Sequence, residues 1–190
     1  MKRILLAFAV LLTMAACTEK KESAPATTDE SATVTNSSEA AKAEEQRPAI
    51  SDEERTANMA EVQAYLKECG AFFIATIDGD QPRVRPFGVS EIIDGKLYFC
   101  TGKVKDVYKQ IAKNGKVEIC ALKASGSEWM RLYGTLVNDE TLTVKETFLE
   151  RNPHLKSMYK ADDDNMSTLY ITNATARFCS FSAEERDVFF

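Results

Sequence analysis

The feature that most constrains the fold of this chain is a series of short β-prone runs joined by Asp-Gly pairs. The runs are rich in β-branched and aromatic residues, which fit a pleated, half-buried surface. Asp-Gly favours tight hairpin turns because both residues tolerate positive φ. The runs are residues 71–77, 82–93 and 96–101, with Asp78-Gly79 and Asp94-Gly95 between them. The pattern predicts consecutive antiparallel strands, with a bulge in the second strand near Pro86-Phe87-Gly88.

Helical patterns flank these strands. Ser51 followed by Glu54 is a capping box. Apolar residues then recur at helical spacing as far as Cys69, and Gly70 is a natural C-cap. These signals predict a helix over 52–69. Further helices are predicted at 104–113 and 142–150, a turn or helix at 153–159, and strands at 116–123, 128–137, 168–172 and 174–182. Many short strands with few helices indicate a mainly β fold, a barrel or a sandwich.

The first 17 residues resemble a bacterial lipoprotein signal. A charged start precedes the apolar run 4–12, which is too short to span a bilayer, and small residues stand directly before Cys17. The resemblance implies a signal peptide over 1–16, cleavage before Cys17 and lipidation of that cysteine. We therefore expect an extracytoplasmic bacterial lipoprotein, anchored to the membrane by acyl chains. An uncleaved N-terminal anchor helix is the alternative.

Residues 17–50 form the next expected unit, a lipidated cysteine followed by a disordered tether. Its Ala, Thr, Ser, Glu and Lys composition buries too little apolar surface to offset chain entropy. Residues 51–190 are then one folded domain. The net charge of −5 argues against nucleic acid as a partner.

The remaining cysteines do not indicate a metal site. Cys69, Cys100, Cys120 and Cys179 show no CxxC spacing and have no histidine partner. The last three stand in apolar strand-like runs, where a buried free thiol is expected. A disulfide remains an alternative outside the cytoplasm.

Two segments offer an anion-binding site. One runs from Arg83 to Gly88 in a predicted strand, and the other from Thr101 to Lys105 where a strand meets a helix. Cations, a hydroxyl, a glycine and the free N–H groups of a helix start are what a phosphate binds. A cation at Lys105 is disfavoured by the helix dipole unless an anion is bound nearby. The alternative for Arg83 and Arg85 is that they only form a solvated, charged face of the strand.

In order and spacing, five segments resemble the pyridoxamine-phosphate-oxidase-like FMN-binding split barrels. They are 73–79, 82–86, 98–103, 109–114 and 117–120, and the resemblance covers about residues 58–185. It implies a six-stranded antiparallel split β-barrel with flanking helices. It also implies a homodimer that holds FMN at its interface, and an oxidoreductase that exchanges electrons with a small molecule. The resemblance does not imply a particular substrate.

The resemblance also implies which residues contact the cofactor. The strand from Arg83 would lie along the flavin, the segment from Thr101 would close on the phosphate, and a later strand would reach the cleft from either subunit. No protein acid or base is required, because FMN supplies the chemistry. For Trp129, the alternative to a cofactor contact is a place in the hydrophobic core. The expected cofactor-binding residues are Arg83, Val84, Arg85, Pro86, Phe87, Thr101, Gly102, Lys103, Lys105, Trp129 and Arg131.

A second hypothesis is a non-catalytic surface lipoprotein that binds haem, deazaflavin or another ligand. The signal has no twin-arginine pattern, which indicates export in the unfolded state, so FMN would be acquired outside the cytoplasm. The lone His154 is expected to be an exposed turn residue, although it permits haem ligation. A purely structural lipoprotein with a decayed site is a third alternative.

Overall fold

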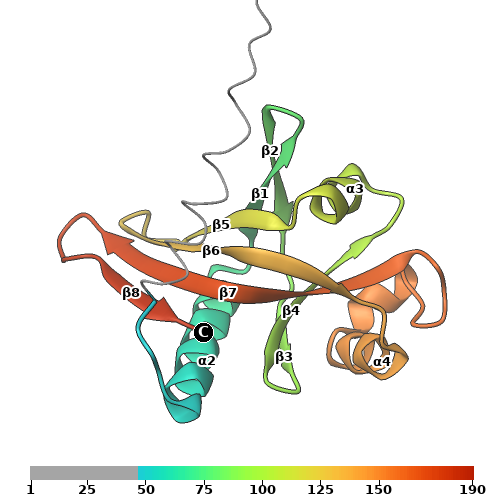
Figure 1. The fold of residues 1–190 in the computed structure, drawn as a ribbon, viewed down its shortest axis with the longest axis horizontal. Helices are drawn as coiled ribbons and strands as arrows, with labels where there is room; N and C mark the ends of the chain where they lie inside the picture. The colour runs from blue at the N-terminus through green and yellow to red at the C-terminus, as the bar shows by residue number, and fades with distance from the viewer. Residues whose placement is uncertain (1–46) are drawn as a thin grey trace, which may run out of the picture.

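Residues 47–190 are described by a computed structural model, and they form one antiparallel sheet of eight strands with helices packed on it (Figure 1). The sheet order is β2-β1-β5-β6-β7-β4-β3, and β8 pairs with β7. The helices are α2 (Asp52–Cys69), α3 (Asp106–Lys113), α4 (Leu142–Arg151) and the 3-10 helix η1 (Pro153–Ser157). The strands are β1 (Phe72–Asp78), β2 (Gln81–Phe87), β3 (Glu91–Ile93), β4 (Lys96–Gly102), β5 (Lys116–Leu122), β6 (Glu128–Asp139), β7 (Met166–Ser180) and β8 (Arg186–Phe189).

Helix α2 begins and ends where its capping residues predict. The Ser51 hydroxyl accepts a hydrogen bond from the Glu54 amide at 3.1 Å, which satisfies one of the free N–H groups of the first turn. Gly70 closes the helix with φ of +71°, a conformation that glycine adopts without steric cost. On the inner face of α2, Val62 and Leu66 are buried against the sheet.

The predicted strand 82–93 is two strands that lie at opposite ends of the sheet order. β2 pairs only with β1, and β3 pairs only with β4. The chain leaves the sheet at 88–90, which is where the bulge was expected. β2 and β3 are therefore both edge strands, and the sheet is split between them rather than closed by hydrogen bonds.

The two predicted strands 168–172 and 174–182 are a single strand, β7. It passes Asn173 with φ of +53°, opposite an irregularity in β6 between Tyr133 and Thr135. Only glycine fits at position 134, because a Cβ there would lie 2.8 Å from the Thr172 carbonyl oxygen. The mainly β antiparallel class with flanking helices is confirmed, and the short strands β3 and β8 bring the strand number to eight rather than six.

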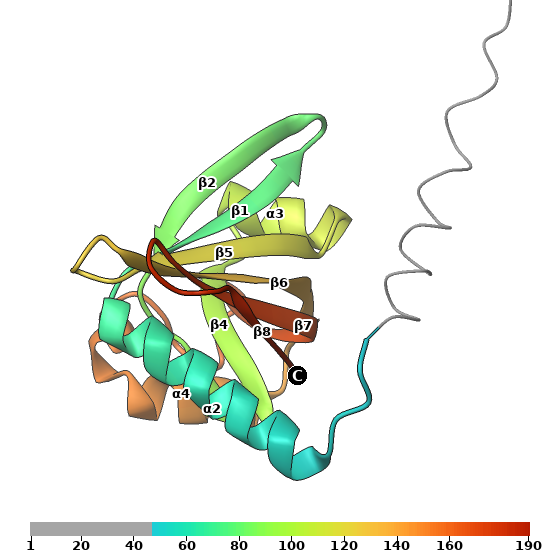
Figure 2. The same cartoon turned by 90° about the vertical axis from the view of Figure 1, so that its left-hand side faces the viewer.

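Two apolar cores lie on opposite faces of β4 and β7. The first fills the curl of the sheet beneath α2, and the second lies between the sheet, α4 and η1. Figure 1 shows α2 and α4 on either side of the β3–β4 hairpin, and Figure 2 gives the perpendicular view. The second core includes Tyr98, Phe148, Leu155, Tyr159 and Met166. This packing places η1 beside the C-terminal end of β4, where the predicted phosphate segment begins.

The predicted signal peptide, Cys17 and nearly all of the predicted tether lie outside the described residues. Within residues 47–190, none of the helices combines the length and apolar character needed to cross a membrane.

Candidate functional site

A cavity of about 260 Å³ lies where the split in the sheet brings the two predicted segments together. β2 and β4 are not neighbours in the sheet, so this meeting depends on the curl of the whole sheet. The cavity is lined by Arg85, Pro86, Phe87, Gly88, Val89, Cys100, Thr101, Lys105, Val107, Leu155, Met158 and Tyr159. Five of the predicted cofactor-binding residues therefore share one cavity: Arg85, Pro86, Phe87, Thr101 and Lys105.

Helix α3 begins at this cavity with uncapped amides. Lys105 is the N-cap residue, and its side chain makes no capping hydrogen bond. The first N–H groups of a helix lack intrahelical partners and carry partial positive charge. Lys105 Nζ lies 5.8 Å from the centre of the Tyr159 ring. A cation and free amide donors thus stand together at the cavity, which is the donor set that a phosphate uses.

The Arg85 side chain is held by its own chain instead of being free in the cavity. One guanidinium nitrogen donates to the Thr76 hydroxyl at 2.6 Å and to the Ile74 carbonyl oxygen at 3.2 Å. The other terminal nitrogen donates to Gln110 Oε1 at 2.7 Å, and Thr76 donates to the same atom. Burial and the neighbouring Arg83 lower the pKa of Arg85. Arg85 therefore ties β2, β1 and α3 together, and it is a positioning residue of the cavity.

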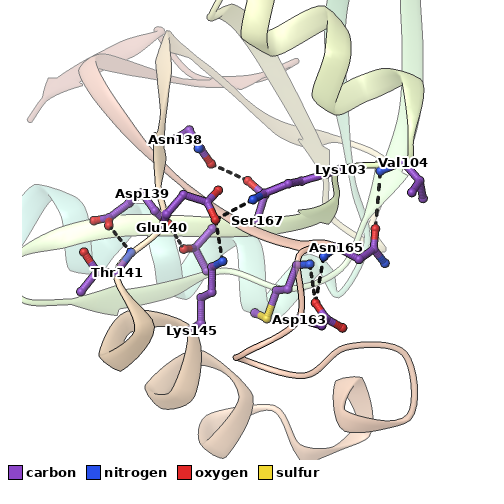
Figure 3. Close-up of polar contacts among 12 residues, drawn as sticks. Lys103, Val104, Asn138, Asp139, Glu140, Thr141, Lys145, Asp163, Asn165 and Ser167 are labelled. Carbon is purple, nitrogen blue, oxygen red and sulfur yellow. Dashed lines mark hydrogen bonds and ion pairs between the residues drawn. The ribbon is translucent and has the colours of Figure 1, made fainter.

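The turn after β4 is packed under the loop 160–165. A Cβ on Gly102 would lie 3.0 Å from Asn165 Oδ1 and 3.4 Å from a Tyr159 ring carbon. Asp163 shapes the loop, because its carboxylate accepts from the amides of Lys160, Asn165 and Met166. Figure 3 shows Asn165 reaching the amide of Val104. Gly102 thus allows close approach by the loop.

Lys103 forms an ion pair that the sequence did not predict. Its Nζ lies 2.8 Å from Glu140, and Lys145 Nζ lies 2.6 Å from the same carboxylate oxygen (Figure 3). Burial acts to raise the pKa of Glu140, but hydrogen bonds from Lys103 and Lys145 outweigh it and lower the pKa to about 2. The hydrogen bond to Glu140 raises the pKa of Lys103. Lys103 anchors the turn after β4 to the start of α4.

Cys100 lies in the cavity wall as a protonated thiol. Burial raises its pKa to about 12, and the nearby Lys105 only partly opposes this shift. A thiol with so high a pKa is a poor nucleophile at neutral pH. The described cysteines are all free. Cys179 is buried as expected, whereas Cys100 is half-buried and Cys120 is exposed, contrary to the expectation of buried thiols. No cluster of metal-ligating side chains occurs within residues 47–190.

The other predicted residues lie outside the cavity lining of the single chain. Arg83 is about half exposed and lies 3.5 Å from Asp78. Val84 is exposed on the other face of β2. Trp129 packs against Phe181 with ring centres 5.2 Å apart, beside a different cavity.

Arg131 pairs with Glu118 on the outer face of the sheet. His154 is exposed in η1, as expected. Leu155, Met158 and Tyr159 form a cavity wall that was not predicted, because no local sequence pattern connects them with β4.

Comparison with known proteins places this geometry in a family. The pyridoxamine 5′-phosphate oxidase family profile matches residues 59–159. A NimC/NimA family protein from Clostridium acetobutylicum is 41% identical, with a TM-score of 0.70 over 73% of this chain and 96% of its own. No curated protein matches.

Two more distant solved structures share the fold. General Stress Protein 26 from Bacillus anthracis is 17% identical, with a TM-score of 0.55 over 68% of this chain and 98% of its own. A heme binding protein from Mycobacterium smegmatis is 13% identical, with a TM-score of 0.53 over 75% of this chain and 60% of its own. With the family profile and the 41% identical relative, the split sheet and its cavity identify this chain as a member of the pyridoxamine 5′-phosphate oxidase-like family.

Proposed function

We propose that this protein is an FMN-dependent oxidoreductase that binds its flavin in the cavity between β2, β4 and η1. Members of the family bind FMN. The observation that carries the proposal is the shared position of Thr101, Lys105 and the uncapped start of α3 at one cavity. These groups fit a phosphate, because a cation, a hydroxyl and helix-start amides are its usual donors.

Each part of the cavity has a role in this proposal. Lys105, Thr101 and the first amides of α3 would hold the phosphate. The free edge of β2 offers main-chain donors and acceptors for the polar rim of the flavin ring. Tyr159 and Met158 would limit the access of water. Bound flavin would supply hydride transfer at its ring, so the protein contributes binding and orientation. The electron donor, the acceptor and the substrate are small molecules not yet identified.

We further propose that two copies associate through the outer face of the sheet. This face carries exposed apolar side chains from neighbouring strands: Phe73, Ile77, Val84, Leu122 and Tyr133. Contiguous exposed apolar surface on a soluble domain marks an interaction site. A cavity of about 260 Å³ is below the usual 300–1,000 Å³ of ligand pockets, so a partner subunit would complete it. Trp129 and Arg131, which lie on this face, are proposed to reach the flavin of the partner.

Titration with FMN tests the proposed cofactor. The purified full chain should quench FMN fluorescence at one FMN per chain, and the bound flavin should be reduced by a nicotinamide cofactor. Lys105→Met should weaken FMN binding by about 1.5–3 kcal/mol, the scale of a charge-assisted hydrogen bond. Lys113→Met, in the last turn of the same helix, is the matched control and should bind normally. Equal binding by both variants would contradict the phosphate site.

The alternative function is non-catalytic binding of haem, deazaflavin or another ligand. The observation that favours haem is the position of His154 in η1, next to the cavity-lining Leu155. Titration with hemin should then give a Soret band that weakens in His154→Ala. A protein that retains FMN and gives no such band excludes the haem alternative.

We propose that the protein acts as a membrane-anchored bacterial lipoprotein outside the cytoplasm. The support is the signal-like segment that ends at Cys17. Radioactive palmitate supplied to the producing cells should label the protein, and Cys17→Ser should abolish the label. A label that persists in Cys17→Ser would contradict lipidation at this residue.

A further inference from the structure

A second cavity lies apart from the one between β2, β4 and η1. It has a volume of about 570 Å³ and lies at the opposite end of β4. Its wall comes from 47–50, the first turns of α2, the β3–β4 turn, the middle of β7 and the end of the chain. Figure 2 shows the start of α2, the lower end of β4 and the C-terminus on one side of the molecule. Ligand pockets usually measure 300–1,000 Å³, so the volume suits a small molecule.

Every charged side chain that lines this cavity is basic. The three are Arg47, Arg55 and Lys96, in a chain whose net charge is −5. No acidic side chain from residues 47–190 lines it. Basic side chains with no acidic side chain among them attract anions to the cavity.

The three cations have different roles. Arg47 donates to the main-chain oxygens of Ala174 at 2.7 Å and Phe190 at 3.1 Å, so it holds the segment 47–50 against the sheet as part of the wall. Arg47 is therefore a structural part of the cavity wall.

Arg55 and Lys96 are the cations that remain for a ligand. Arg55 makes no ion pair and no side-chain hydrogen bond with the described residues. Lys96 places its Nζ 4.2 Å from the centre of the Tyr170 ring, and its charge also helps to lower the pKa of Asp139. That ring holds the ammonium at the cavity. Neither Arg55 nor Lys96 forms a salt bridge with a carboxylate of residues 47–190.

The rest of the wall combines apolar and aromatic residues with the polar Thr172 and Asn173. Met59 and Ile171 are buried, and Tyr170, Phe189 and Phe190 supply rings. A ligand that satisfies both the cations and the rings has an anionic group on a flat apolar body. We propose that this cavity is a second binding site, separate from the proposed flavin site, for a small aromatic anion bearing a phosphate or carboxylate.

Calorimetric titration with phenyl phosphate tests the site. The full chain in a non-ionic detergent should bind phenyl phosphate at this cavity, and Arg55→Met/Lys96→Met should weaken that binding at least about tenfold, the scale of losing charge-assisted hydrogen bonds. Lys109→Met/Lys113→Met removes the same charge from an exposed helix face and should bind as wild type. Both substituted residues are on the surface, so folding should be unaffected. Binding by Arg55→Met/Lys96→Met equal to wild type, or no binding by wild type, would overturn the proposal.

Two further arms identify the ligand. Lys105→Met should leave this binding unchanged within twofold, which separates it from a phosphate bound at α3; a loss as large as in Arg55→Met/Lys96→Met would place the anion at α3 instead. Inorganic phosphate should bind at least about tenfold more weakly, because it gains nothing from the rings. Equal affinity for the two probes would overturn the aromatic part of the proposal. Displacement by phosphatidylglycerol vesicles, whose headgroup has no aromatic ring, would overturn the aromatic part of the proposal, and no displacement would support a soluble aromatic anion.

Discussion

The ammonium of Lys103 lies 2.8 Å from the carboxylate of Glu140, which also accepts from Lys145 at 2.6 Å. The Lys145 side chain is only 6% exposed, whereas Glu140 is 41% exposed. One carboxylate therefore pairs with both a buried cation and a cation of the predicted phosphate segment, and it balances only one of the two charges. A flavin phosphate must compete with Glu140 for Lys103, but it meets no such competitor at Lys105 within the described residues.

Glu140→Gln should tighten FMN binding if the flavin occupies the proposed cavity. Removing the carboxylate frees Lys103 and makes the potential at the end of β4 more positive. The expected gain is about two- to fivefold, the upper part of the roughly 0.2–1 kcal/mol that an exposed ion pair contributes. Fluorescence titration measures it, and Glu118→Gln, which breaks the Arg131 pair on the outer face, is the control. Weaker binding in Glu140→Gln would contradict competition between Glu140 and the phosphate.

The pH dependence of stability should also report Glu140. Its pKa falls from the ordinary 4.5 to about 2 in the folded protein. Between these values the unfolded chain binds more protons than the folded one, so the stabilisation is present above pH 4.5 and is lost as the pH falls toward 2. Urea unfolding at pH 7, 4 and 3 should show a shallower acid decline in Glu140→Gln than in wild type. Parallel declines in the two proteins would contradict this assignment.

Arg85→Met should destabilise the domain by about 1.5–3 kcal/mol, because the charged hydrogen bonds to Thr76 and Gln110 are lost. Arg85→Lys should not restore stability, since an ammonium cannot reproduce the planar fork that spans β1 and α3. Chemical denaturation measures both variants. Arg83→Met is the control, because its pair with Asp78 is exposed and long at 3.5 Å, and the loss should stay below about 1 kcal/mol. Equal losses in Arg83→Met and Arg85→Met would contradict the positioning role of Arg85.

Phe73→Glu should shift a dimer toward monomers. Phe73 is 47% exposed in the centre of the apolar outer face, between β2 and β5. A carboxylate buried there without a partner should raise the dimer dissociation constant at least about tenfold. Leu142→Glu changes a residue of the same exposure on α4 and should leave the assembly unchanged. Analytical ultracentrifugation measures both variants, and a wild-type monomer would refute the proposed dimer outright.

Local chemistry made much of the fold predictable. Asp94 and Gly95 both have positive φ, at 47° and 71°, so the predicted β3–β4 turn follows from the residues themselves. The Ser51 cap and Gly70 likewise define α2 from within a few residues. The segments that begin at Arg83 and Thr101 were also predictable as parts of the site, because each one contains its anion-binding residues within a few consecutive positions.

Long-range packing decided the rest. The 82–93 run alternates well enough for one strand, yet β2 and β3 lie at opposite ends of the sheet order, and only the completed sheet determines this. The same holds for β7, whose continuity past Asn173 depends on pairing along β6.

The site shows the same division. By itself the sequence determined the hairpins, the helix boundaries and the two segments that contribute to the cavity, because caps, turns and β propensity act over a few residues. Only the tertiary structure decided that Arg85 bonds to Gln110, that Lys103 pairs with Glu140, and that Tyr159 forms a wall of the cavity. The physical reason is that the members of each pair are at least 25 residues apart in the chain. Which cation meets which carboxylate or amide is therefore decided by how the sheet curls and by what it buries.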